Sequence, residues 1–233
     1  MSVATTSVET QAKPSRLGLF WTNQIGKKFF SAVTGVILFV FVLGHLLGNL
    51  QVFAGAEKLN AYAKFLQEAK GLLWATRIVL LAAVGVHAVA GTQLWLQKRD
   101  ARPVGYATSA SIQASVGSRT MIWTGLLTLA FIVFHLLDLT VGAVVASAGF
   151  KHGEAYQNVV ATFRQPVKVG AYGISLVALG LHLSHGLYSM FQSLGFRHPL
   201  WTPTIQKAAV VIAFFLALFY LFIPAGVVFG RIF

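Results

Sequence analysis

The sequence predicts an all-α integral membrane protein, a bundle of five transmembrane helices, from three observations. Of its 233 residues, 56% are hydrophobic and only 10% are charged, whereas soluble domains carry about 25% charged residues. Five apolar stretches are long enough to cross a bilayer, which takes roughly 20 helical residues. These stretches do not alternate between apolar and polar residues, as the strands of a membrane β-barrel would.

The composition also excludes several classes of function. The net charge is +12, but in such an apolar chain the basic residues indicate a membrane surface or an acidic partner rather than nucleic acid. The chain has no cysteine, which excludes disulfides, covalently attached c-type haem, cysteine-ligated iron–sulfur clusters and thiolate catalysis. Histidine, with seven residues, is the only metal-ligating type present in quantity.

Residues 1–25 are predicted to form a polar N-terminal tail, because they contain no apolar run of the kind found in a cleavable signal peptide. The membrane domain then covers residues 26–233. An odd number of spans places the two termini on opposite sides, and the loops on the N-terminal side carry slightly more Lys and Arg. This difference weakly favours a cytoplasmic N-terminus in the cytoplasmic membrane. The five spans are expected at 29–53, 73–97, 120–149, 167–194 and 208–230.

The loops between the spans differ in character. Those on the side opposite the N-terminus are expected to form short interfacial helices. Residues 56–70 place Leu59, Tyr62, Phe65 and Leu66 on one helical face, and residues 154–164 do the same with Tyr156, Val159, Val160 and Phe163. The loop at 98–118 is polar with basic flanks, which indicates a docking surface or a flexible connection.

The chain contains a tandem repeat of one helical hairpin, formed by spans 1–2 and again by spans 3–4. Spans 1 and 3 share a Thr-Gly pair followed, at the same spacing, by His-Leu-Leu, with His45 and His135 as the histidines. Spans 2 and 4 share Gly-x-His-x-x-x-Gly around His87 and His182. The repeat therefore selects one histidine in each of four spans.

Their depths predict how these histidines pair. An imidazole within hydrocarbon is costly and usually functional, although a helix–helix hydrogen bond can satisfy a single one. Because successive spans run in opposite directions, His45 and His135 should lie near the far side, and His87 and His182 roughly 10 Å away near the cytoplasmic side. Two histidines per level, on different helices, match the requirement for bis-imidazole ligation of a haem between helices.

Other metal sites fit the sequence less well. A catalytic zinc or di-iron site would need three or more ligands with carboxylates among them, and Asp138 is the only candidate for a buried acid. Gly91 and Gly186 follow His87 and His182 by one turn, where they either clear space for a flat macrocycle or allow close helix packing. The remaining histidines are predicted to be structural (His185) or solvated in loops (His152 and His198).

Four segments carry a resemblance to a known family: FVLGHLLGN in span 1, VGVHAVAG in span 2, RTMIWTGLLTLAFIVFHLLD in span 3 and LHLSHGLYSMFQSLG in span 4. In order and spacing they resemble the di-haem cytochrome b membrane-anchor subunit of succinate:quinone oxidoreductases (succinate dehydrogenase and fumarate reductase), in its single-chain, five-helix type. The resemblance covers roughly residues 20–230.

This resemblance implies two b haems and a quinone, more often menaquinone in this family type. His87 and His182 would ligate the iron of the proximal haem, and His45 and His135 that of the distal haem. The partners would be a flavoprotein subunit and an iron–sulfur subunit, which carry out the succinate chemistry. This subunit would anchor them and pass electrons through the haems to or from membrane quinone.

Two further groups of residues are candidates for the site. Lys28, Ser31, Arg119 and Gln192 lie near the cytoplasmic edge, where they would either contact haem propionates or, for the basic ones, extend to the interface. Asp138, one turn beyond His135, is predicted to handle protons near a distal quinone site. Glu68 is a second candidate, and a structural, hydrogen-bonded acid is the alternative for Asp138.

The sequence leaves three alternatives open. The chain could be the di-haem cytochrome b subunit of another membrane oxidoreductase, of the hydrogenase or formate dehydrogenase type. It could be a transporter or structural membrane protein whose histidines bind no haem. It could also be a degenerate anchor in which only one haem site is filled.

Overall fold

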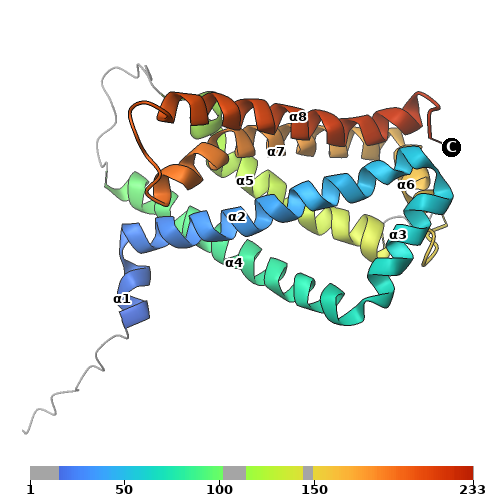
Figure 1. Ribbon diagram of the computed structural model, residues 1–233, viewed down its shortest axis with the longest axis horizontal. Helices are drawn as coiled ribbons and strands as arrows, with labels where there is room; N and C mark the ends of the chain where they lie inside the picture. The colour runs from blue at the N-terminus through green and yellow to red at the C-terminus, as the bar shows by residue number, and fades with distance from the viewer. Residues whose placement is uncertain (1–15, 102–113, 144–148, 233) are drawn as a thin grey trace, which may run out of the picture.

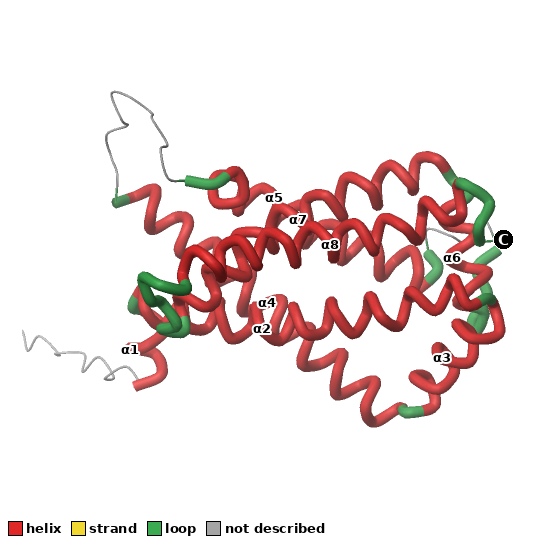
Figure 2. The backbone as a smooth tube through the Cα atoms, turned by 45° about the horizontal axis from the view of Figure 1, so that its top comes forward, coloured by secondary structure: helices red, strands yellow, loops and turns green. Residues whose placement is uncertain are grey.

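The computed structural model describes residues 16–101, 114–143 and 149–232, and the regular structure within these ranges is entirely helical (Figure 2). Most of the predicted N-terminal tail, 1–15, lies outside the described residues. So do residues 102–113 of the predicted polar loop and residues 144–148 at the end of the predicted third span.

Within the described ranges, five helices are long and apolar enough to cross a membrane, as predicted. Two of them continue beyond the α-helix itself. The first span continues into a 3-10 turn, η1 (Leu50–Ala54), and the third into a π-helical turn, η2 (Leu136–Val141). The spanning helices are α2 (Gln24–Asn49), α4 (Lys70–Asp100), α5 (Val116–His135), α7 (Pro166–Ser193) and α8 (Thr202–Val228).

The third span ends earlier than the sequence predicts, at Val141 instead of residue 149. Gly142 stops it by adopting a positive φ of 76°, a conformation that favours glycine. The ring of Phe150 also occupies the position that a side chain on Gly142 would need. At the other end of the chain, α8 begins at Thr202 instead of residue 208, with a proline in its first turn.

The described part of the predicted N-terminal tail contains a short helix. Residues Arg16–Thr22 form helix α1, which packs against the start of α2. The rings of Phe20 and Phe30 make this contact edge to face, with their centres 5.8 Å apart.

The helices pack as two hairpins with a fifth helix outside them (Figure 1). α2 pairs with α4 in the first hairpin and α5 pairs with α7 in the second, and the hairpins meet through α2 with α7 and through α4 with α5. α8 packs on α7 and α2, and the Tyr220 hydroxyl donates a hydrogen bond to the Val42 carbonyl oxygen at 2.8 Å. Helix α1 and the C-terminal end lie at opposite ends of the bundle (Figure 1).

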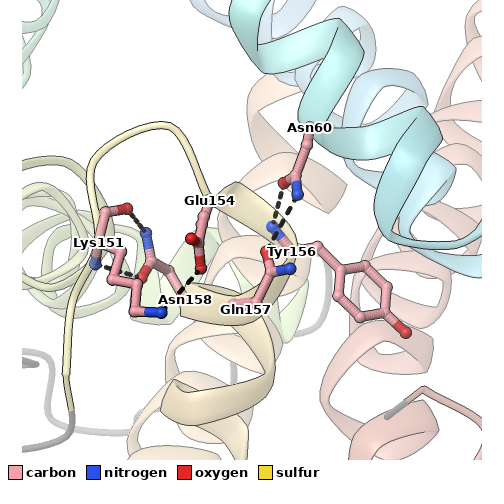
Figure 3. Close-up of polar contacts among 6 residues, drawn as sticks. All are labelled: Asn60, Lys151, Glu154, Tyr156, Gln157 and Asn158. Carbon is pink, nitrogen blue, oxygen red and sulfur yellow. Dashed lines mark hydrogen bonds and ion pairs between the residues drawn. The ribbon is translucent and has the colours of Figure 1, made fainter.

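The two predicted surface helices are present, as α3 (Ala56–Glu68) and α6 (Ala155–Phe163). They lie at the same end of the bundle (Figure 1) and contact each other (Figure 3). Asn60 on α3 accepts a hydrogen bond from the Tyr156 backbone N–H at 2.9 Å and donates one to Gln157 Oε1 at 3.0 Å. These bonds join the first hairpin to the second.

A cluster of buried apolar side chains lies at this end of the bundle, around the predicted apolar faces of α3 and α6. Leu59, Val159, Val160 and Phe163 are buried there, whereas Phe65 of the predicted face is exposed. The loop before α6 is fixed by Asn158, whose amide accepts from the Lys151 N–H at 3.0 Å and donates to the Lys151 carbonyl oxygen at 2.8 Å (Figure 3).

Candidate functional site

The four repeat histidines come together in the two pairs that their predicted depths imply. The ring centres of His87 on α4 and His182 on α7 are 6.2 Å apart. Those of His45 on α2 and His135 on α5 are 5.8 Å apart. Two imidazoles bonded to opposite sides of one metal ion, at about 2 Å each, place their ring centres roughly 6 Å apart. Both pairs therefore have a spacing suited to one metal ion.

In the first pair, hydrogen bonds within each hairpin fix the rings. His87 Nδ1 lies 3.0 Å from the Ser31 carbonyl oxygen and 3.3 Å from Thr34 Oγ1. The Thr34 hydroxyl proton is already donated to the Phe30 carbonyl oxygen at 2.6 Å. Because Nδ1 faces acceptors only, it carries the ring proton, and Nε2 keeps its lone pair for a metal.

The second hairpin repeats this arrangement. His182 Nδ1 lies 3.5 Å from Thr124 Oγ1, which donates its own proton to the Thr120 carbonyl oxygen at 3.0 Å. The glycine after each threonine makes room for the ring. A Cβ on Gly125 would lie 3.2 Å from His182 Cε1, and one on Gly35 would lie 3.5 Å from the same atom of His87. The repeated Thr-Gly pair thus seats a histidine of the next helix.

The second pair is asymmetric. His135 Nδ1 lies 3.3 Å from the Tyr172 hydroxyl oxygen. His45 Nδ1 instead lies 3.2 Å from the amide nitrogen of Asn49, which also donates to the His45 carbonyl oxygen at 2.7 Å. An amide nitrogen is a donor, so this contact would have to be exchanged for His45 to bind a metal through Nε2. Phe41 stacks on the His45 ring at 5.3 Å.

Asp138 is fully buried at the level of the second pair and has three partners. Its Oδ1 lies 2.6 Å from Lys168 Nζ, in a salt bridge with both side chains buried. Its Oδ2 accepts from the Tyr172 hydroxyl at 3.0 Å and from the Thr162 hydroxyl at 3.3 Å. A buried charge requires such pairing.

Lys168, Tyr172 and Thr162 belong to this site although the sequence does not predict them. A signal for two of them was present, because Lys168 and Tyr172 are four residues apart and share one face at the start of α7. That start lies at the same end of the bundle as Asp138, which follows the third span's α-helix. An acidic residue in the last turn of one span and a basic residue in the first turn of the next lie at the same end of the bundle. Such residues are candidates for a buried ion pair.

The other predicted residues are more dispersed. Lys28, Arg119 and Gln192 are exposed, while Ser31 is half-buried and contacts His87 through its carbonyl oxygen. Glu68 is exposed and lies 3.8 Å from Lys64, in a pair separate from the Asp138 cluster.

The remaining histidines occupy the positions expected for them. His152 and His198 are exposed loop residues. The Cβ of His185 lies 3.2 Å from where a Cβ on Gly117 would be, so His185 packs against α5. Across the described ranges, His, Asp and Glu side chains do not gather in groups of three or more, and the repeat histidines occur as pairs.

A family model described as the succinate dehydrogenase/fumarate reductase transmembrane subunit matches residues 99–222, from the end of α4 into α8. No curated protein and no solved structure matches the chain. The matched segment is more than half of the chain and contains two of the paired histidines, His135 and His182. This protein, a multi-pass membrane protein with five apolar helices, therefore belongs to the family of succinate dehydrogenase/fumarate reductase transmembrane subunits.

Proposed function

We propose that this chain is the cytochrome b subunit of a succinate:quinone oxidoreductase. In this role it anchors the flavoprotein and iron–sulfur subunits to the cytoplasmic membrane. Its paired histidines would hold two b haems, which would supply electron transfer between those subunits and membrane quinone. The observation that carries the proposal is the pairing of four histidines, one from each of four helices, at ring-centre distances of 6.2 and 5.8 Å.

The residues around the pairs fit a haem. Nδ1 of His87, His135 and His182 faces an oxygen acceptor, which leaves Nε2 for the iron. Among the described residues, a Cβ on Gly91 would meet no heavy atom within 4 Å, and one on Gly186 would meet only Met121 Cε, at 3.6 Å. Each helix is therefore open beside its histidine, on the face that a flat macrocycle would need. A bound haem supplies one-electron chemistry.

In this proposal, each residue of the chain acts by binding and orienting. His87 and His182 hold the proximal haem, and His45 and His135 hold the distal one. The threonines of the Thr-Gly pairs fix the ring tautomer at the proximal level. Because the ligands come from apolar helices, the site excludes water and lowers the local dielectric, which helps to set the reduction potential.

Haem propionates are anionic and would need donors near the edge of the membrane. Lys28, Ser31, Arg119 and Gln192 remain candidates at the edge of the membrane. On α4, the side-chain oxygens of Gln93 and Gln97 are buried without a hydrogen-bond partner among the described residues. Turning either amide would present an N–H donor at the same place, and a carboxylate is a suitable acceptor for it.

The quinone, with menaquinone as the first candidate, is assigned to the distal level. Asp138 and Glu68 are proposed to handle its protons. If they do, D138N and E68Q, each in the intact complex, will lower quinone turnover. Unchanged turnover in either variant removes that residue from the proposal.

The end of the bundle that carries α1 is assigned to the cytoplasmic side of the membrane, where the N-terminus would lie. The partner subunits would bind at this same end. The test is to purify the complex through an affinity tag on this chain. We expect a flavoprotein and an iron–sulfur protein to co-purify, and succinate to reduce the haems that dithionite reduces. Reduction by hydrogen or formate instead would indicate another oxidoreductase, and a colourless, folded protein would indicate a transporter or structural protein.

A further inference from the structure

A continuous chain of polar contacts joins one histidine to a buried charge. His135 Nδ1 lies 3.3 Å from the Tyr172 oxygen, and the Tyr172 hydroxyl lies 3.0 Å from Asp138 Oδ2. Asp138 Oδ1 in turn lies 2.6 Å from Lys168 Nζ. Asp138, Lys168 and Tyr172 are all buried, with exposed fractions of 0%, 6% and 4%.

The chemistry of the groups fixes the direction of each hydrogen bond. An ionised carboxylate only accepts, so the single hydroxyl proton of Tyr172 is donated to Asp138. The tyrosine oxygen is then an acceptor toward His135, and His135 Nδ1 must carry the ring proton. The carboxylate therefore selects, through the tyrosine, the tautomer of His135 whose Nε2 lone pair is free.

We propose that Asp138, held in place by Lys168, orients His135 and strengthens it as a metal ligand through Tyr172. This inference rests on the proposed function, in which His135 ligates the distal haem. A hydrogen bond from the outer N–H of a ligating histidine toward a carboxylate raises the basicity of the ring. A more basic ligand favours ferric iron, so the cluster lowers the reduction potential of the distal haem.

The repeat shows that the hairpin fold does not require this cluster. The position that Asp138 occupies after His135 is taken by Gly48 after His45, and Gly48 packs closely against the Tyr62 ring. In the first hairpin, the Asn49 amide nitrogen is a donor toward the His45 ring, where Tyr172 offers an acceptor to the His135 ring. The two distal histidines thus have opposite hydrogen-bond partners, and the carboxylate chain is specific to the second hairpin.

A buried ion pair is also a weak source of net stability, because the desolvation of both charges offsets their attraction. The pair is better explained by what it does for Tyr172 and His135. Asp138, Tyr172 and Lys168 are positioning residues in this inference.

The test is a redox titration of the purified complex with Y172F, which keeps the ring and removes the hydroxyl. The midpoint potential that is missing from the titration of H135A is assigned to the distal haem. We expect Y172F to keep two haems and to raise only the midpoint potential of the distal haem. The rise should be about 59 mV for each tenfold decrease in the preference of the site for ferric over ferrous iron. Y220F is the matched control, since its hydroxyl donates to the Val42 carbonyl although its ring lies 6.3 Å from that of His45.

The outcomes separate this inference from the proposed function. Wild-type protein without haem would contradict both. Two haems in Y172F with both potentials unchanged would overturn the inference alone, as would an equal shift in Y220F. If Y172F loses the distal haem, D138N, which keeps an oxygen acceptor for Tyr172 and removes the charge, decides instead. A higher distal potential in D138N supports the inference, and an unchanged one overturns it.

Discussion

The imidazole rings of His87 and His182 lie with their centres 6.2 Å apart, although the two residues belong to different hairpins. The other pair, His45 and His135, also joins the first hairpin to the second. Each pair is therefore formed by the assembly of the two halves of the chain. A haem bound at either pair would tie the halves together, because it would bond to both.

The first prediction separates His182 from its neighbour His185. His182 faces His87, whereas His185 packs against α5 beside Gly117. We expect His182→Ala to lose one of two haems and His185→Ala to keep both, as measured by the haem-to-protein ratio of the purified complex. Loss of a haem in His185→Ala alone would show that the ligand is assigned to the wrong histidine.

The second prediction concerns which histidines share a haem. His45→Ala and His135→Ala should each lose the distal haem, and the double variant should lose no more than either single one. Combining His45→Ala with His87→Ala should remove both haems, because these residues belong to different pairs. Haem content and the number of potentials in a redox titration measure this. The pairing would be contradicted if His45→Ala and His135→Ala each lost a different haem.

A third prediction tests the space beside the proximal ring. A Cβ at residue 125 would lie 3.2 Å from His182 Cε1, and the branched side chain of valine would press further on the ring. Gly125→Val should therefore lower the content of the proximal haem and leave the distal one in place. Gly170→Ala on α7 is the control, because a Cβ there would meet no heavy atom of the described residues within 4 Å. Full haem content in Gly125→Val would mean that the close approach has no role in seating His182.

The fourth prediction concerns the stability of the bundle. Lys168→Met removes one partner of a buried ion pair and leaves Asp138 uncompensated, which costs about 3–5 kcal/mol in comparable sites. Lys64→Met removes a pair whose side chains are 75% and 67% exposed, and exposed pairs contribute only about 0–1 kcal/mol. The first variant should lose its fold at a clearly lower temperature in detergent than the second. Equal melting temperatures would contradict the importance of the buried pair.

Much of the fold could be predicted because a bilayer restricts the possible structures. Apolar length alone locates the five spans, and amphipathic periodicity locates α3 and α6. The errors lie at helix ends. The end at Val141 depends on the positive φ of Gly142 and on the Phe150 ring beside it, a contact that sequence distance hides. Helix α1 depends on packing of aromatic rings against α2.

The candidate site was predictable to the extent that it repeats. The register of the two hairpins selects the four histidines and their levels. Lys168 and Tyr172 have no matching residues in the first hairpin, where Leu73 and Arg77 stand at the same offsets from His87. The internal repeat therefore does not indicate Lys168 and Tyr172 as site residues. Their role depends on the contact of α7 with the turn that holds Asp138, which only the three-dimensional structure reveals.

The most direct test of the central claim is a reduced-minus-oxidised visible spectrum of the purified complex, with haem quantified per copy of this chain. The four paired histidines predict b-type spectra and two haems per chain. Well-folded protein without haem would contradict the claim, because the paired histidines would then serve helix packing or transport instead of electron transfer.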